Sequence, residues 1–269
     1  MSSYFAGKRV LVTGGTNGLG RVIAEAFGRV GAKVAVVGLE EADARATGES
    51  LSANGVDALA LVGDVTAEAD TERFARLTAE RFGGIDILVN AAGRTHRGWI
   101  LETPSDEILS LFKLNLLGTV QMTRAAMPYL LKSESPHVVN IGSLAAKSAS
   151  RWVGAYPISK FAVAAFSQQL RLEMREKGLH VLLVCPGPVK RENPRLYPLK
   201  HAEGIPESAL MPGGGVKVGK IDPVRLAEKI LAACRKRKPE LVVPGKARLL
   251  FAIEQLFPRL GDWIVLRKT

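Results

Sequence analysis

The sequence predicts an α/β fold of the Rossmann type: a doubly wound, parallel, seven-stranded sheet with helices on both faces and a C-terminal helical extension. Short apolar runs alternate with longer amphipathic ones, which is the pattern of repeated βαβ units. The apolar runs are rich in valine, leucine and alanine, as expected for strands that helices bury on both faces. No linker, repeat or low-complexity tract divides the 269 residues, so a single domain over residues 1–269 is expected.

Seven apolar runs are expected to be strands, and six amphipathic stretches between them are expected to be helices. The strands are residues 8–13, 33–38, 57–62, 85–90, 137–142, 180–185 and 240–244. The helices are residues 18–31, 41–54, 67–82, 106–132, 156–177 and 222–236. Right-handed crossovers between parallel strands then place helices on both faces of the sheet.

Two segments depart from this alternation. Residues 186–220 are rich in proline and glycine and follow the carboxyl end of a strand. Ligands bind at such ends, so we expect a substrate-covering loop, with a disordered insertion as the alternative. Residues 245–269 carry apolar side chains at helical spacing, at Leu249, Leu250, Ile253, Leu256 and Phe257. We expect this extension to dock on the domain or on a partner subunit, with a membrane surface as the less favoured alternative.

The net charge is +11, which fits a nucleic-acid or membrane partner, or a basic surface that attracts an anionic cofactor. No nucleic-acid motif is present, so a basic surface that attracts an anionic cofactor is favoured and no nucleic-acid partner is expected.

Cys185 and Cys234 lack the spacing of a disulfide framework. No signal peptide or membrane-spanning run is found, and a cytoplasmic location is expected. The four histidines lack metal-ligand spacing, so no metal site is expected: His96, His137, His180 and His201.

A glycine-rich turn lies between the first predicted strand and the first predicted helix. Its glycines are Gly14, Gly15, Gly18 and Gly20. Glycines let a backbone approach a pyrophosphate, and a helix N-terminus offers free N–H groups and a positive dipole end. The spacing is neither GxGxxG nor a P-loop, so a tight turn is the alternative for this motif taken alone.

Tyr156 and Lys160 are four residues apart and fall on one face of a predicted helix. Pro157 is tolerated only in a first turn, so the helix is expected to begin close to Tyr156. The same spacing occurs at Tyr4 and Lys8, where a structural role is expected because that pair precedes the first strand.

The chain resembles the short-chain dehydrogenases/reductases in the order of its motifs, from residue 8 to about 188. The matching motifs are the TGxxxGxG loop at 13–20, Asp64-Val65, the segment from Asn90 to Gly93, Asn115, Ser143, YxxxK at 156–160 and Pro186-Gly187. The resemblance implies an NAD(P)-dependent oxidoreductase that interconverts a ketone and a secondary alcohol.

The resemblance also implies roles for four residues. Tyr156 is the expected general acid or base. A tyrosine has a pKa near ~10, and the Lys160 cation would stabilise its anion. Ser143 is expected to orient the substrate oxygen, so the expected substrate contacts are Ser143 and Tyr156. Asn115 is expected to hold a proton-relay water near Lys160.

The expected cofactor contacts follow the same motifs. They are Gly14, Thr16, Asn17, Gly18, Leu19, Gly20, Asp64, Val65, Asn90, Ala91, Gly93, Tyr156, Lys160, Pro186, Gly187 and Val189. Asp64 is expected to meet the adenine. The sequence departs from the family pattern at Ala91, where an asparagine is usual, and after Gly187, where a threonine often contacts the carboxamide.

The sequence leaves the choice between NAD(H) and NADP(H) open, with a slight preference for NAD(H). NAD-preferring members tend to carry an aspartate at the position of Gly38, and NADP-preferring members an arginine at that of Leu39 or a basic residue at that of Asn17. None of these residues is present. Glu40 would repel a 2′-phosphate if its side chain pointed inward, but a solvated position at a helix start is favoured.

An apolar pocket is expected near the nicotinamide, lined by Leu144, Trp152, Pro188, Leu196, Tyr197, Leu210 and Met211, with loop packing as the alternative. Arg94, His96 and Arg97 are expected on the surface, with contact to an anionic substrate tail as the alternative. A homodimer or homotetramer is expected, paired through the helices at 106–132 and 156–177. The competing function is a dinucleotide-sensing or scaffold protein on the same fold.

Overall fold

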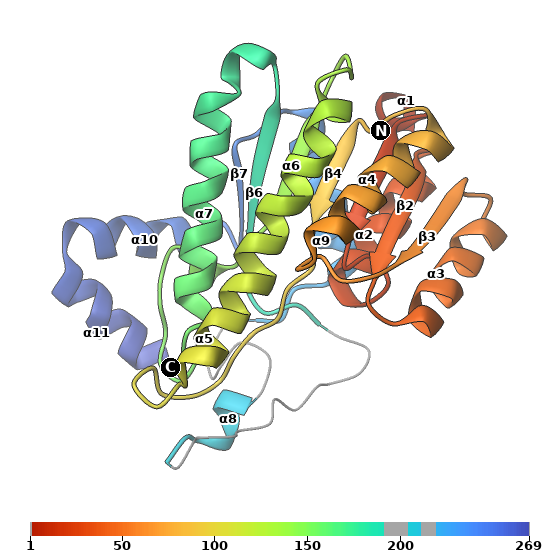
Figure 1. Cartoon of the computed structure of the whole chain (residues 1–269). Coiled ribbons are helices and arrows are strands. Elements are labelled where there is room, and N and C mark those ends of the chain that lie inside the picture. Colours follow the sequence, from red (N-terminus) through yellow and green to blue (C-terminus); the bar gives the residue numbers. More distant parts are fainter. Residues whose placement is uncertain (1, 191–203, 211–218, 269) are drawn as a thin grey trace.

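The computed structural model describes residues 2–190, 204–210 and 219–268. Seven parallel strands form one sheet in the order β3-β2-β1-β4-β5-β6-β7 (Figure 1). Their bounds are β1 (Arg9–Thr13), β2 (Lys33–Gly38), β3 (Ala58–Val62), β4 (Ile87–Asn90), β5 (His137–Ile141), β6 (His180–Pro186) and β7 (Glu240–Val243). The strand order changes direction between β1 and β4, so the switch point of this doubly wound sheet lies there. The predicted fold class is confirmed.

Helices cover both faces of the sheet. One face packs against α2 (Gly18–Arg29), α3 (Glu41–Ala53) and α9 (Pro223–Arg235), and the other against α4 (Glu68–Phe82), α6 (Gly118–Leu130) and α7 (Tyr156–Glu173). The remaining helices are α1 (Ser2–Phe5), α5 (Ser105–Phe112), α8 (Glu207–Leu210), α10 (Ala247–Leu256) and α11 (Pro258–Lys268). Single turns occur at η1 (Lys113–Leu117), η2 (Leu144–Ala146) and η3 (Arg175–Lys177).

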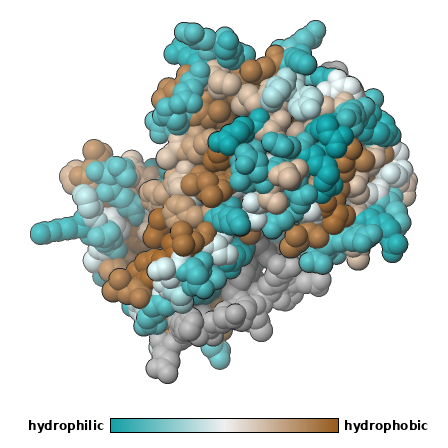
Figure 2. Space-filling view, viewed as in Figure 1, coloured by the Kyte–Doolittle hydropathy of each residue, from teal (hydrophilic) through white to brown (hydrophobic). Residues whose placement is uncertain are grey.

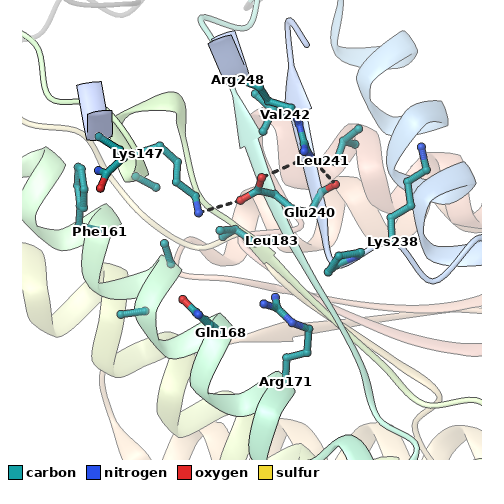
Figure 3. Close-up of a pocket in the computed structure, with 15 residues that line it drawn as sticks. Lys147, Phe161, Gln168, Arg171, Leu183, Lys238, Glu240, Leu241, Val242 and Arg248 are labelled. Atoms are coloured by element: carbon teal, nitrogen blue, oxygen red, sulfur yellow. Dashed lines mark hydrogen bonds and ion pairs between the residues drawn. The ribbon is translucent and has the colours of Figure 1, made fainter. Parts of the chain in front are cut away.

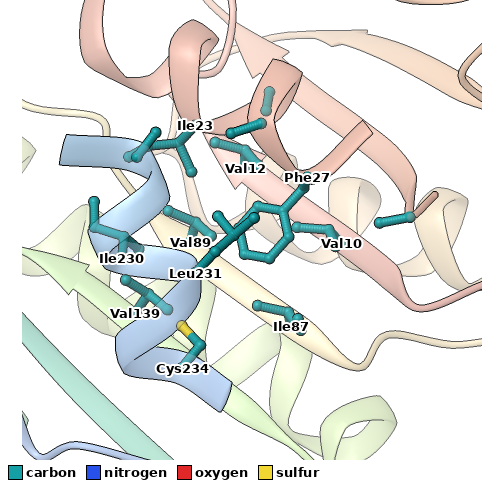
Figure 4. Packing of buried hydrophobic residues seen from close by; sticks show 14 of the residues in the cluster. Val10, Val12, Ile23, Phe27, Ile87, Val89, Val139, Ile230, Leu231 and Cys234 are labelled. Atoms are coloured by element: carbon teal, nitrogen blue, oxygen red, sulfur yellow. The ribbon is translucent and has the colours of Figure 1, made fainter. Parts of the chain in front are cut away.

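The core follows from the alternation of side chains along strands that are buried on both sides. Val10 and Val12 of β1 face α2 and α9, whereas Leu11 between them faces the opposite helices. Phe27 of α2 is fully buried and packs among apolar side chains of the sheet and of α9 (Figure 4). This packing fixes the N-terminus of α2 at the carboxyl end of β1.

Most predicted boundaries differ from the observed ones by at most two residues, but three predicted helices are interrupted. The predicted helix at 106–132 is α5, a π-helical turn over Lys113–Leu117, and α6. The helix at 156–177 ends at Glu173 and is followed by a 3₁₀ turn. The C-terminal extension is two helices, because Pro258 cannot continue the hydrogen bonding of α10.

The C-terminal extension leaves the sheet after β7 and folds back, so that α11 returns toward the N-terminal end of α7 (Figure 1). Gly261 of α11 lets the two helices approach, since a Cβ there would lie 2.5 Å from Cγ of Glu254. None of the helices within residues 2–190, 204–210 and 219–268 is long and apolar enough to cross a membrane.

Candidate active site

The glycine-rich loop after β1 brings the chain close to the loop after β4. Gly14 has a φ of +61°, and a Cβ on it would lie 2.8 Å from Cα of Ala92. A Cβ on Gly20 would lie 2.1 Å from the carbonyl oxygen of Gly14. A side chain at Gly14 would therefore push the two loops apart, and one at Gly20 would distort the glycine-rich loop itself. Within the part of the chain that the structure describes, the N-cap residue Asn17 makes no side-chain capping bond, and no atom lies within 4 Å of a Cβ placed on Gly18. The N-terminus of α2 therefore fits an anion.

Asn90 at the end of β4 is a buried structural anchor. Its Nδ2 donates hydrogen bonds to Oγ1 of Thr123 at 3.0 Å and to Oδ1 of Asn140 at 2.9 Å. The next amides, of Ala91 and Ala92, donate to Oγ1 of Thr13 at 3.2 and 3.3 Å. The backbone turn at 90–93 is thus held without the side-chain amide that family members usually carry at position 91.

Asn115 lies buried in the π-helical turn η1 and ties three segments together. Its Nδ2 donates to the Arg94 carbonyl at 3.0 Å and to Oγ of Ser159 at 2.9 Å, and its Oδ1 accepts from the Arg94 amide at 2.9 Å. A Cβ on Gly93 would lie 2.8 Å from this Oδ1. Asn115 therefore positions the loop after β4 beside the first turn of α7.

Ser143, Tyr156 and Lys160 meet where β5 ends and α7 begins. Ser143 has an extended backbone and caps η2, with its Oγ accepting from the Ala145 amide at 3.1 Å. Lys160 donates from Nζ to the Ile141 carbonyl at 2.9 Å, and this Nζ lies 5.9 Å from the centre of the Tyr156 ring. Burial lowers the pKa of Lys160 to about 8.

One cavity of about 860 Å³ connects the glycine-rich loop with Ser143, Tyr156 and Lys160. Of the predicted cofactor contacts, it is lined by Gly14, Asn17, Gly18, Leu19, Gly20, Ala91, Gly93, Pro186, Gly187 and Val189. Six cations are among its described lining residues, and no carboxylate is: Arg94, Arg97, Lys160, Lys190, Lys246 and Lys268. The site therefore favours an anionic ligand.

Five predicted site residues do not line this cavity: Thr16, Asp64, Val65, Asn90 and Asn115. Thr16 is buried under β2, where a Cβ on Gly38 would lie 2.2 Å from its Oγ1. Asp64 accepts from the Thr66 amide at 2.8 Å, and Val65 is buried against Gly118.

Two expectations about single side chains are wrong. Arg97 is not on the surface: its side chain is buried, lines the cavity, and donates from Nε to the Ala209 carbonyl of α8 at 2.8 Å. Trp152 does not line the cavity, whereas its neighbour Val153 does. The backbone at Trp152 has a φ of +60°, and the Arg151 guanidinium lies 4.6 Å from its ring centre.

Other predicted pocket residues divide into three groups. Leu144 and Pro188 line the cavity, and Leu210 of α8 does not. Leu196, Tyr197 and Met211 lie outside the described residues. Arg94 is exposed as predicted and pairs with Glu107 at 2.7 Å.

The sequence did not assign the C-terminal extension to the active site of the same chain. Its inner side lines the cavity through Ala247, Leu250, Phe251, Ile264, Val265 and Lys268. The helical spacing of Leu250 and Phe251 signals an apolar face, but only the tertiary structure shows what that face covers.

A second cavity, of about 830 Å³, is lined by residues of α7 and β7 (Figure 3), and Tyr156 is not among its lining residues. Glu240 stands at its centre and pairs with Lys147 at 2.9 Å and with Arg248 at 3.3 Å. This cavity contains none of the residues expected to take part in the reaction.

Comparison with known proteins assigns this site to a family. Residues 8–196 match the family model described as short chain dehydrogenase. The chain is 32 % identical over 266 residues to the probable oxidoreductase EphD of Mycobacterium tuberculosis, covering 95 % of this chain and 44 % of that protein. The chain thus spans less than half the length of this relative. The chain belongs to the short-chain dehydrogenase/reductase family.

Solved structures agree with this assignment. A short-chain dehydrogenase from Streptomyces avermitilis superposes with a TM-score of 0.79 at 30 % identity, covering 97 % of both chains. A family member from Burkholderia cenocepacia in complex with NADP gives 0.77 at 26 % identity, covering 91 % of this chain and 99 % of its own. One from Burkholderia phymatum in complex with NAD shares the fold, with a TM-score of 0.82 at 24 % identity, covering 94 % and 95 %.

Proposed function

We propose that this protein interconverts a ketone and a secondary alcohol, with Tyr156 as the general acid and base. The observation that carries the proposal is the continuous cavity, which reaches from the open N-terminus of α2 to Ser143, Tyr156 and Lys160. A dinucleotide fits this space because glycine backbone and helix N–H groups stand at one end and a proton donor at the other. When bound, its nicotinamide accepts or supplies the hydride.

The protein's own groups handle the proton. In the direction of reduction, the Tyr156 hydroxyl donates its proton to the carbonyl oxygen of the substrate. Because Ser143 Oγ accepts from the Ala145 amide, its own hydrogen can be donated to the same oxygen. The buried Lys160 favours the tyrosinate that remains, since a nearby cation stabilises an anion.

We propose a substrate that is largely apolar. The wall of the cavity beyond Tyr156 is formed by apolar side chains from three parts of the chain: Leu144, Val153, Leu250, Phe251 and Ile264. The pattern of an apolar lining with few polar groups at the reacting centre is that of small-molecule sites.

We propose NAD(H) as the preferred cofactor. NAD-preferring members tend to carry an aspartate at position 38, whose carboxylate bonds the ribose diol. In this protein a side chain at Gly38 would collide with Thr16, so the lack of an aspartate there does not argue against NAD. Asn17 at the mouth of the loop lies 3.4 Å from Oδ2 of Asp43, and a carboxylate there disfavours an added phosphate. The exposed position after β2 is occupied by Leu39, so the arginine that would pair with the 2′-phosphate of NADP is not present there.

We also propose a homodimer or homotetramer that pairs through α7, in a cytoplasmic setting. Exposed side chains follow one stripe of this helix, at Ile158, Phe161, Ala165, Gln168 and Leu172. Burying such a stripe against a second copy would remove apolar surface from water. Light scattering is expected to give a mass above that of one chain.

The two cysteines support the proposed cytoplasmic setting. The buried thiols of Cys185 and Cys234 are unpaired, as in a reducing compartment.

A spectrophotometric screen tests the proposal. Purified protein is incubated with NADH or NADPH and a series of ketones, or with NAD or NADP and the matching alcohols, and the reduced nicotinamide is followed by absorbance. Turnover of apolar ketones or alcohols is expected. Tight dinucleotide binding without turnover of any carbonyl or alcohol would favour a sensor and contradict the proposal.

A further inference from the structure

The C-terminal extension carries exposed apolar side chains on the side that faces away from the cavity. Six of them, between 47 and 72 % exposed, form what we call the outer patch: Leu249, Leu256, Phe257, Leu260, Trp263 and Leu266. The inner side of the same helices faces the active-site cavity, which Leu250 and Ile264 line. The two helices therefore have one apolar side toward the site and another toward solvent.

Cations accompany the outer patch. Residues 245–268 contain five lysines and arginines and two carboxylates. Arg248 pairs with Glu240, and Lys246 and Lys268 line the active-site cavity, so the outer patch has Arg259 and Arg267 as its neighbouring cations. Hydrophilic and hydrophobic side chains alternate over this part of the surface (Figure 2). One of the carboxylates, Glu254, is turned inward to Ser148. The Arg267 guanidinium lies 3.9 Å from the centre of the exposed Trp263 ring. A tryptophan with a neighbouring cation suits the headgroup level of a membrane, where the ring and the charge meet lipid.

We propose that the outer patch binds the surface of a membrane that contains anionic lipids. The helices would lie in the plane of the interface, with the outer patch at the boundary between headgroups and acyl chains. This inference does not depend on the proposed reaction. Because the inner side of α10 and α11 lines the cavity, binding would also place the cavity beside the lipid.

Charge favours lipid over a second copy of the chain at the outer patch. Two copies that met patch to patch would bring Arg259 and Arg267 of both chains together. An anionic surface neutralises the same cations instead, and each one near such a surface strengthens binding about fivefold.

Vesicle co-sedimentation of the full-length protein tests the proposal. One set of vesicles contains phosphatidylcholine alone, and the other contains phosphatidylcholine with phosphatidylglycerol. The protein is expected to pellet with the mixed vesicles at low salt, to remain soluble with the neutral ones, and to be released by high salt. Failure to bind the mixed vesicles at low salt would overturn the proposal.

Matched variants locate the contact. Trp263→Glu is expected to lower partitioning onto mixed vesicles by at least about tenfold, since the ring is exchanged for a charge at the interface. Val224→Glu, at an exposed position of α9, changes the net charge equally and is the control. Arg259→Gln is expected to weaken binding about fivefold on mixed vesicles only. Circular dichroism melting establishes that each variant is folded.

A second readout does not depend on any loss of binding. Brominated lipids quench tryptophan that lies in the interface, so wild-type fluorescence is expected to fall on binding. Trp263→Phe is expected to bind like the wild type and to lose this quenching. Equal partitioning of Trp263→Glu and Val224→Glu would contradict the proposal. The proposal would also be contradicted if light scattering gave Trp263→Glu a lower oligomeric mass than the wild type, because the outer patch would then be an interface between copies.

Discussion

Ser148 donates a hydrogen bond of 2.6 Å from its Oγ to Oε1 of Glu254, and so joins the loop after β5 to the C-terminal extension. Ser148 also lines the active-site cavity. Burial raises the pKa of the Glu254 carboxyl, and its Oε2 is buried with no hydrogen-bond partner among the described residues. The position of α10 over the cavity thus depends on a partly buried carboxylate and its one donor from this loop.

Ser148→Ala is expected to destabilise the protein by about 1–3 kcal/mol, because it removes the donor from a carboxylate that is partly buried. The free energy of unfolding in urea measures this loss. Ser52→Ala, at an exposed position of α3, is the control and is expected to change little. Equal free energies of unfolding for the two variants would show that the contact does not hold the extension in place.

Two buried histidines at the opposite end of the sheet form a chain with fixed proton positions. His180 Nε2 donates to the Lys238 carbonyl at 2.8 Å, which leaves its Nδ1 as an acceptor. This Nδ1 accepts from His137 Nδ1 at 2.7 Å, and His137 Nε2 then accepts from the Tyr4 hydroxyl at 2.8 Å. The Lys8 ammonium lies over the Tyr4 ring at 5.1 Å, and neither residue of this first YxxxK pair lines the active-site cavity.

Stability is expected to fall in acid because both histidines must be neutral. Burial, and next the neighbouring His180, lower the pKa of His137 to about 3, below the unfolded value near 6.5. The unfolded state therefore binds more protons between these values, so the free energy of unfolding decreases as pH falls from 6.5 toward 3. The decrease is about 2 kcal/mol at pH 5 for one such group. Urea unfolding at pH 7 and pH 5 measures it, and His137→Gln should lessen the difference; an unchanged difference would contradict this assignment.

The sequence predicted the sheet, and it predicted that Ser143, Tyr156 and Lys160 would meet at one end of the sheet, for a physical reason. Buried strands and amphipathic helices have local periods, and Ser143, Tyr156 and Lys160 lie in motifs whose spacing is fixed by one strand and one helix. The π-helical turn at Lys113–Leu117 has no such local signal, because it depends on Asn115 meeting the distant Arg94 and Ser159.

Side chains whose environment comes from distant segments were harder to place. Arg97 looks like a surface cation in the sequence, yet its Nε donates to the carbonyl of Ala209, which follows more than a hundred residues later. The apolar spacing at Leu249 and Leu250 predicts a helix, but it does not tell which side faces the cavity. Trp152 was expected in the pocket. Its backbone is in the left-handed region, and the types of the neighbouring residues do not predict that conformation.

Asn115→Ala is expected to lower kcat while leaving the fold intact. The substitution removes two donors and one acceptor that hold the Arg94 backbone beside Ser159, so the loop after β4 becomes free to move. The expected cost in stability is about 1–3 kcal/mol. Steady-state kinetics and urea unfolding measure both effects. Asn54→Ala, at an exposed helix end, is the control, and a kcat equal to that of the control would argue against the positioning role of Asn115.

Leu39→Arg is expected to raise the ratio of kcat/KM for NADP to that for NAD. Leu39 is exposed at the end of β2, and a guanidinium there can pair with a 2′-phosphate. Initial rates with both cofactors measure the ratio. Val224→Arg, which adds the same charge at an exposed position of α9, serves as the control. If the two variants give the same ratio, position 39 does not read the ribose.

The most direct test of the proposed chemistry is the turnover of Tyr156→Phe. The substitution removes only the hydroxyl, so the fold and the affinity for the dinucleotide, measured by calorimetric titration, are expected to remain. The rate of oxidation of the reduced nicotinamide with a ketone that the wild type accepts is expected to fall by about 10²–10⁴-fold, the usual contribution of a general acid. A rate close to that of the wild type, with dinucleotide binding unchanged, would contradict the role of Tyr156 as the proton donor.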